Sequence, residues 1–427
     1  MIYRTLPLLL LALVFGGCDM GGGKSDPPTV VFGWRSAGLV LPDADNTGGL
    51  HRLVNIGNHI FVMDAYTPGY MPGQAEDGKF YHWRVWQGNV GSDVWDSLPM
   101  PNGNTPSEWI VIGDFLYIGM KYTGEVWRYD PNGAQWAQIK LPTLPVSPQN
   151  WNFVLFLGSY QGELVVGEGA MGSNQSLFWM GGVKDTIGQS IAGTGVQMSY
   201  PQGRAVEFDG YLYGISEQFG VYRWKTGQAA WQLLESPRGR NDSMVVDPCA
   251  LAAAVVGYTG ALSCPETKVN TETEMVSAIG VHDGHLFVGY DSYQAGLWRM
   301  ESDGSWTSVT PLQPKYEVRD APRDIRVILS YQSRFFMAGV SGSSVMMYKP
   351  ADVNTPKLGD WKLVDNGWCN NPGYGCGSQT WGLIGVGDTL YATGWGFVAK
   401  CPIADLDSMA RDLYPAIMDS IAADSGS

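Results

Sequence analysis

One arrangement of apolar and polar positions recurs along the chain. It consists of an apolar strand, a tight turn with Gly, Asp or Asn, a second strand of the type Leu-Tyr-x-Gly, a variable loop, a third strand such as VWRY, and a fourth strand that carries tryptophan. The clearest copies span 110–139, 205–234 and 278–309, and weaker copies begin at 53, 156, 328 and 383. The turns of these seven copies follow one another at a mean interval of about 55 residues.

Each copy predicts four short antiparallel strands, because apolar and polar residues alternate and Asp-Gly turns are typical of hairpins. A sheet of four short strands cannot bury both of its faces alone, and radial repetition covers them with neighbouring sheets. The sequence therefore predicts an all-β fold over residues 30–403, a seven-bladed β-propeller of four-stranded antiparallel blades.

The two ends of the repeat are incomplete in a complementary way. The seventh copy stops at 397–403 without a fourth strand, whereas the apolar segment 30–34 stands before the first copy with no partner. We expect the N-terminal strand to complete the last blade and to close the ring by hydrogen bonds, since an open strand edge favours aggregation.

The blade at 127–145 is similar to the kelch repeat. In both, a tyrosine on the third strand and a tryptophan on the fourth are followed by a connection that contains proline. Kelch repeats also close the second strand with a Gly-Gly pair, and the corresponding positions here are Gly119-Met120, Gly214-Ile215 and Gly289-Tyr290. The chain thus resembles a divergent kelch-like propeller, a resemblance that implies the fold and the placement of loops but no activity.

The N-terminus has the order of a secretion signal. Residues 1–17 contain one cation, Arg4, an apolar run from Leu6 to Phe15 and two glycines, and they precede Cys18. This end resembles a bacterial lipobox, which implies that 1–17 is a lipoprotein signal peptide and that Cys18 is acylated. Residues 18–29 then form a flexible tether. The predicted location is the bacterial cell envelope, lipid-anchored to a membrane and facing the periplasm or the exterior; the alternatives are an ordinary signal peptide or a short anchor.

Cysteine use agrees with export to an oxidising compartment. The two pairs that close short loops are Cys249 with Cys264 and Cys369 with Cys376, so we predict two disulfides. Cys401 remains and is interpreted as a buried small apolar residue in a strand.

The C-terminal segment 404–427 is an acidic tail, helical or disordered. Leu406, Met409, Ala410 and Leu413 have helical spacing before Pro415 interrupts it. Two interpretations stay open, a short helix packed on the ring and a helix that docks a partner.

Composition excludes some classes of partner. The chain has 27 Lys and Arg against 41 Asp and Glu, a net charge of −14, which disfavours nucleic acid. Its 44% hydrophobic content excludes an intrinsically disordered chain.

Candidate ligand-binding residues follow from the repeat. Most tryptophans lie on third and fourth strands and are expected to pack between blades. The residues at the start of each first strand are expected to ring one mouth of the central channel, on the face that also carries both predicted disulfides. They are His51, Arg52, Trp109, Trp151, Asn152, Arg204, Arg323 and Trp381. Arginine with aromatics at a concave mouth suits a polar ring compound or an anionic sugar; the alternative is that these residues cap and plug the channel.

Other chemistry has little support in the sequence. His282 and His285 lie at a first hairpin turn and are interpreted as a solvated turn, and the segment from Asp43 has Val54 where a calcium loop needs a carboxylate. No metal, cofactor or catalytic motif is predicted. The favoured function is a membrane-anchored binding or scaffold propeller for a glycan, a peptide or another partner in the envelope, such as an envelope protein. The alternative is a saccharide-active enzyme, a lyase or glycosidase, on the same scaffold.

Overall fold

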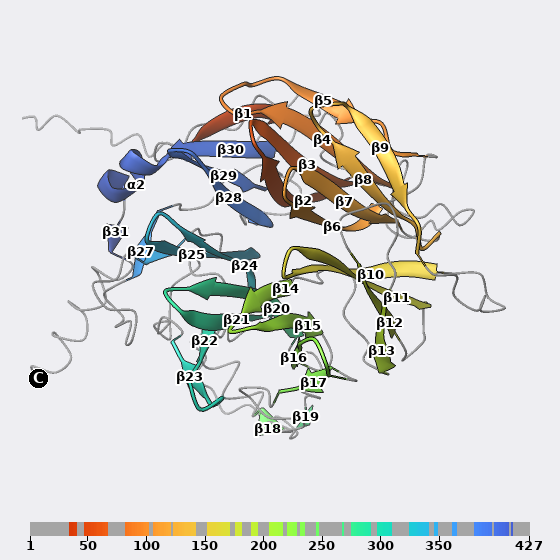
Figure 1. The fold of residues 1–427 in the computed structure, drawn as a ribbon. Helices are drawn as coiled ribbons and strands as arrows, with labels where there is room; N and C mark the ends of the chain where they lie inside the picture. The colour runs from red at the N-terminus through yellow and green to blue at the C-terminus, as the bar shows by residue number, and fades with distance from the viewer. Residues whose placement is uncertain are drawn as a thin grey trace, which may run out of the picture.

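The fold was analysed in a computed structural model of the chain. The structure describes residues 34–40, 47–66, 82–101, 106–120, 123–141, 152–170, 176–181, 189–194, 205–216, 220–228, 231–234, 245–246, 267–268, 275–291, 297–309, 324–340, 346–348, 361–364, 380–394, 397–409 and 411–412. Small antiparallel sheets are arranged around a common centre, each with its first strand innermost, which confirms the predicted β-propeller (Figure 1).

Five sheets have four strands each. In four of them the strands pair in sequence order, and in the fifth the N-terminal strand is added at the edge of the last three strands. Four of them are β2 (Thr47–Ile56), β3 (His59–Tyr66), β4 (His82–Asn89) and β5 (Trp95–Leu98); β6 (Pro106–Ile112), β7 (Phe115–Met120), β8 (Val126–Asp130) and β9 (Gln135–Ile139); β10 (Asn152–Tyr160), β11 (Glu163–Ala170), β12 (Ser176–Gly181) and β13 (Gln189–Thr194); and β14 (Ala205–Phe208), β15 (Tyr211–Ser216), β16 (Gly220–Trp224) and β17 (Gln232–Leu233). The fifth is β28 (Gly382–Val386), β29 (Thr389–Thr393), β30 (Phe397–Pro402) and β1 (Arg35–Val40).

The sixth sheet of the ring has nine strands. They are β20 (Met275–His282), β21 (His285–Asp291), β22 (Leu297–Met300), β23 (Trp306–Ser308), β24 (Asp324–Tyr331), β25 (Arg334–Val340), β26 (Met346–Tyr348), β27 (Trp361–Leu363) and β31 (Arg411–Asp412). One residue pair, Asp291 with Asp324, joins the run β20–β23 to the run β24–β27. The ring thus contains six sheets where the repeat predicts seven separate ones, because β21 and β24 approach closely enough to bridge.

A separate two-stranded sheet lies in the long connection after β17. It pairs β18 (Val245–Val246) with β19 (Thr267–Lys268). No strand was predicted there, because neither segment carries the repeated pattern.

The N-terminal strand closes the ring, as predicted. β1 pairs antiparallel with β30, with Arg35 opposite Lys400 and Ser36 opposite Ala399. Within the described residues the strand spans Arg35–Val40, and residues 30–33 of the predicted strand lie outside the described part. Trp34 precedes the strand, is buried, and donates a hydrogen bond of 2.9 Å from its indole Nε1 to the Val364 carbonyl at the end of β27.

A repeated contact explains the glycine of the Leu-Tyr-x-Gly strand. A Cβ atom on Gly119 of β7 would lie 2.3 Å from Val154 Cγ1, on the first strand of the next sheet. The Ser107 hydroxyl donates to the carbonyls of both Gly119 and Val154. The glycine is required because the neighbouring sheet packs directly on its backbone.

The same joint is repeated half a ring away. A Cβ atom on Gly289 of β21 would lie 2.6 Å from Ile325 Cγ2, and the Ser277 hydroxyl donates to the carbonyls of Gly289 and Ile325. Each of these two joints thus consists of one glycine, one β-branched side chain and one serine, the first between two sheets and the second between the two runs of the nine-stranded sheet.

The C-terminal segment packs on the ring. Helix α2 (Ile403–Met409) follows β30 directly and buries Ile403 and Leu406, and its Asp407 forms an ion pair of 2.8 Å with Arg334 of β25 (Figure 1). β31 then adds to the outer edge of β27. The interpretation of a packed helix is confirmed for 403–409, whereas Leu413 and Pro415 lie outside the described residues.

Several predictions concern residues that lie outside this description. They are the signal peptide 1–17, the tether 18–29 with Cys18, and the disulfide cysteines Cys249, Cys264, Cys369 and Cys376. Cys401 is buried in β30, as expected, and its thiol donates to the Pro402 carbonyl at 3.5 Å. In the described ranges, no helix has the length and hydropathy needed to span a bilayer.

Candidate functional site

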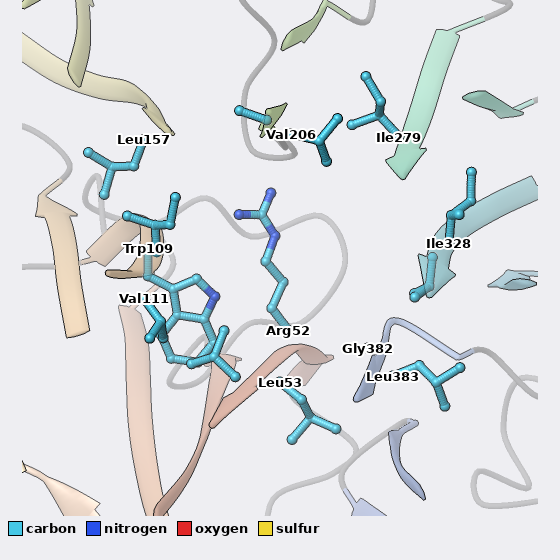
Figure 2. A pocket seen from close by; sticks show the side chains of 14 residues that line it. Arg52, Leu53, Trp109, Val111, Leu157, Val206, Ile279, Ile328, Gly382 and Leu383 are labelled. Atoms are coloured by element: carbon cyan, nitrogen blue, oxygen red, sulfur yellow. The ribbon is translucent and has the colours of Figure 1, made fainter. Parts of the chain in front are cut away.

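A central cavity of about 240 Å³ lies where the first strands of the blades converge. Its lining includes residues from β2, β6, β10, β14, β20, β24 and β28, so each of the seven copies of the repeat contributes its first strand (Figure 2). Residues far apart in the sequence thus share one cavity on the axis of the ring.

Most side chains of the described lining are aliphatic, and polar atoms also contribute to its surface. It consists of Leu53, Val54, Ile110, Val111, Leu157, Ala205, Val206, Ile279, Val327, Ile328 and Leu383, with Gly382 and two residues that carry polar groups, Arg52 and Trp109. Such a surface suits an apolar group that is oriented by a few hydrogen bonds.

Arg52 is held by a buried carboxylate on the neighbouring blade. Its Nη1 donates to Glu108 Oε2 in a short contact, and its Nη2 lies 3.4 Å from Oε1. The Glu108 side chain is 0% exposed and that of Arg52 is 15% exposed. A charge this deeply buried requires a partner of opposite charge. The charges of Arg52 and Glu108 compensate each other, so the pair adds no net charge to the centre of the ring. Figure 2 shows the guanidinium extending towards the middle of the lining residues.

Trp109 packs in the core between two blades, and its indole N–H is a hydrogen-bond donor without an acceptor among the described residues. The residue is 4% exposed and packs with Ile56, Met63 and other residues between two blades. Its buried Nε1 has no hydrogen-bond partner among the residues that the structure describes. In Figure 2 the indole nitrogen lies on the side of the ring that faces Arg52.

β-bulges place polar residues at this level of the first strands. The pairing register shifts between Pro106 and Glu108, between Val276 and Ala278, and between Ile325 and Val327. The extra residues are Ser107, Ser277 and Arg326, and the bulge allows each to reach the next blade, as bulges near functional sites often redirect a side chain. Arg326 stacks over the Trp381 ring at 5.4 Å from its centroid.

The sequence-predicted site residues fall into three groups. Arg52 and Trp109 line the same cavity, and Trp381 lies directly before Gly382 in the lining, under Arg326. His51 and Asn152 are placed on β2 and β10 as backbone only. Trp151, Arg204 and Arg323 lie outside the described residues, next to the first residues of β10, β14 and β24.

The register of two predicted residues differs from expectation. Trp109 and Arg52 lie inside their strands, which begin at Pro106 and Thr47, and not at the strand starts. Both nevertheless line the central cavity.

Glu108 was not predicted as part of this site. A signal for it exists in the repeat, because Arg52 and Glu108 each stand six residues before the turn residue of their copy, Asn58 and Asp114. Equivalent positions on adjacent blades are neighbours in a propeller.

The histidine turn is only partly solvated. Asp283 and Gly284 form the exposed turn, but His282 is buried, its Nδ1 lies 2.7 Å from Ser330 Oγ, and its ring packs on Phe335. Burial lowers the pKa of His282 below 6.5 and the neighbouring His285 adds to this, while Asp283 opposes it. The residues that the structure describes contain no cluster of three or more His, Cys, Asp or Glu that could hold a metal ion.

Comparison with known proteins supports the fold. No family model matches the sequence, and no curated protein is significantly similar to it. A structure of YCF48 bound to D1 peptide is 14% identical, with a TM-score of 0.50, over 88% of this chain and 99% of that one. YCF48 from Cyanidioschyzon merolae gives 14% identity and a TM-score of 0.50, over 87% and 99%. A catalytically inactive virginiamycin B lyase from Staphylococcus aureus with quinupristin gives 9% identity and a TM-score of 0.49, over 86% and 98%. At 14% identity and a TM-score of 0.50, the likeness to the two YCF48 structures shows the fold alone.

Proposed function

We propose that this chain is an extracytoplasmic, membrane-anchored binding or scaffold propeller, without catalysis of its own, whose central channel accepts an apolar segment of an envelope partner. The observation that carries the proposal is the cavity to which all seven first strands contribute. A rigid ring that leaves such a space at its axis, lined by aliphatic side chains and two donors, has the features of a binding site.

A peptide suits this lining better than a glycan. A sugar presents many hydroxyl groups, each of which needs a partner when buried, and the described lining offers polar side-chain groups only from Arg52 and Trp109. An aliphatic side chain on a peptide buries apolar surface and needs few hydrogen bonds. The YCF48 structure bound to a peptide supports this choice at the level of the fold.

The alternative of a saccharide-active enzyme has no comparable support. The described lining contains no carboxylate, and Glu108, a buried carboxylate that precedes the lining residue Trp109, is held by Arg52. An acid–base pair for glycoside cleavage needs two carboxyl groups on either side of the bond.

We infer seven blades for this ring. Seven first strands reach one cavity, and the nine-stranded sheet consists of two consecutive four-strand runs joined at one residue pair, with β31 added at its outer edge. A divergent kelch-like origin agrees with the Gly119 and Gly289 joints.

The anchor and the disulfides complete the proposal. Acylation of Cys18 anchors the ring to the bacterial envelope through the tether 18–29. Disulfides between Cys249 and Cys264 and between Cys369 and Cys376 cross-link two of the loops that connect successive blades. Peptide mapping by mass spectrometry without reduction tests the disulfides: a bond from Cys401 to any of these four contradicts the assignment.

The binding proposal is tested by site-specific photocrosslinking in the cells that make the protein. An aliphatic diazirine amino acid of about leucine size, which does not fill the cavity as an aromatic ring would, is placed at position 206 in the lining. It is compared with the same residue at position 94, where Val94 is 68% exposed and is not among the lining residues. We expect one adduct that contains a peptide from position 206, and we expect that this adduct does not form from position 94. Adducts that are the same from both positions, or that contain only glycan, contradict the proposal.

A further inference from the structure

We propose that the central cavity recognises a branched aliphatic group that carries a neutral amide carbonyl, with the Trp109 indole as the donor to the carbonyl oxygen. The inference rests on the proposed function and names the chemistry of its ligand. Three features of the cavity carry it: an unsatisfied donor, a compensated charge and an aliphatic wall.

The donor is the first feature. Trp109 is 4% exposed, and its Nε1 is buried without a partner within the described part of the chain. Trp34, Trp95 and Trp136 donate to backbone carbonyls at 2.9, 2.7 and 3.1 Å. The buried Nε1 of Trp298, which is not a lining residue, also has no partner within the described residues, so Trp109 is distinguished by its place at the cavity. A buried indole N–H normally finds an acceptor, and leaving it unpaired is costly. Trp109 lines the cavity, so an acceptor oxygen inside the cavity would complete this donor once the neighbouring side chains that cover Nε1 move aside.

The charge balance is the second feature. Arg52 is the one cationic side chain in the described lining, and Glu108 already compensates it. Among the described lining residues, a ligand carboxylate would have to lose its hydration with no uncompensated cation to replace it, which is strongly unfavourable. A neutral carbonyl accepts the Trp109 hydrogen bond without that cost.

Size and surface are the third feature. A cavity of about 240 Å³ is larger than the roughly 150 Å³ space that accommodates benzene in an engineered protein core. A four- or five-carbon branched chain together with one amide group therefore fits. The aliphatic walls, among them Leu157, Val206 and Ile328 in Figure 2, provide contacts for the branched chain.

The test is a titration of the full folded chain followed by the indole N–H signals in two-dimensional ¹H–¹⁵N NMR. The Trp109 signal is assigned by its loss in Trp109→Phe, and Trp136→Phe is the matched control, since Trp136 Nε1 is already bonded to Pro99. The probes are 4-methylpentanamide, 4-methylpentanoate, methyl glucoside and the peptide acetyl-Gly-Leu-Gly-amide. The amide and the carboxylate share one aliphatic group, and the peptide presents the same branched chain next to backbone carbonyls.

We expect 4-methylpentanamide to shift the Trp109 signal saturably, and the carboxylate to bind at least tenfold more weakly. Trp109→Phe, in which binding is followed on the methyl signals of 4-methylpentanamide itself, should weaken amide binding about fivefold, as expected for one neutral hydrogen bond. Trp136→Phe, followed in the same way, should leave it unchanged. Tighter binding of the peptide than of the amide identifies a chain segment as the source of the group, and tighter binding of the amide identifies a free small molecule; both support the inference.

Two results overturn the inference. One is a carboxylate or glucoside that binds as tightly as the amide, and the other is a Trp109 signal that no probe moves, which would mean that the cavity holds water only. Val206→Phe and Ile110→Phe fill the cavity from half-buried positions on two different strands, so at least one folded variant should be obtained, and it should abolish amide binding. If no probe binds while the crosslinked adduct at position 206 persists, the inference fails and the proposed function stands.

Discussion

Removing the side chain of Trp34 tests how the ring is closed. Trp34 is 1% exposed and packs in a cluster with Val364, Leu383 and Phe397, so it joins the N-terminal segment to two blades at once. Its indole also donates to the Val364 carbonyl at 2.9 Å. In Trp34→Ala, both the packing and the hydrogen bond are lost at the joint where β1 meets β30.

The magnitude follows from these contacts. Replacing a buried tryptophan by alanine costs about 3–5 kcal/mol, of which the cavity left behind is a large part. Trp34→Phe keeps most of the apolar contact but loses the hydrogen bond, which contributes roughly 0.5–1.5 kcal/mol. We therefore expect the alanine variant to lose several times as much stability as the phenylalanine variant.

Equilibrium unfolding in urea measures this loss, with Trp136→Ala as the control. Trp136 lies on an outer strand, is only partly buried and donates a similar bond to Pro99. Hydrogen exchange adds a local readout: amides of β30 (397–402) should exchange faster in Trp34→Ala, and those of β8 (126–130) should not. If Trp34→Ala loses no more stability than Trp136→Ala and β30 stays protected, closure does not depend on this joint.

Three further predictions concern the blade joints, a buried histidine and the anchor. Gly119→Ala should cost about 1–3 kcal/mol in urea unfolding because its Cβ overlaps Val154, and adding Val154→Ala should restore part of the loss; no destabilisation would refute the joint. Because the pKa of His282 is lowered by burial, the unfolded chain binds a proton more readily than the folded one. Stability should therefore fall as the pH drops below about 6.5 and level off below the folded pKa, and His282→Gln should reduce this dependence; identical pH profiles of the two proteins would contradict it. Cys18→Ala should abolish labelling by radioactive fatty acid and release the protein from membranes, and unchanged membrane extraction would rule out the lipoprotein anchor.

The order of strands within each blade could be predicted because the sequence features that specify it are local. Alternating side chains and a two-residue turn define each hairpin, so Asp114 and Asp283 mark their turns without reference to the rest of the chain. Closure by the N-terminal strand was also predictable. The last copy of the repeat lacks its fourth strand, and one additional strand segment precedes the first copy. The bridge between Asp291 and Asp324 was not, because it depends on how close two blades come.

The site was predictable only in part, for a similar reason. The repeat locates the first strands, and two of the residues that it singles out, Arg52 and Trp109, line one cavity. It does not reveal the bulges at Ser107 and Arg326, which change which side chains face inward. The partner of Arg52 is a residue of the next blade, Glu108, and a contact between blades emerges only when equivalent positions of successive copies are compared.

The central claim, that the channel binds a peptide segment, is tested most directly by calorimetry. The segment crosslinked at position 206 is synthesised as a peptide and titrated against the chain and against Val206→Phe, with Ile110→Phe as a second filled variant. The account predicts saturable one-to-one binding that weakens at least tenfold in the filled variants, while their urea midpoints stay near that of the unmodified chain. Equal affinity for the filled and unfilled channels would contradict it.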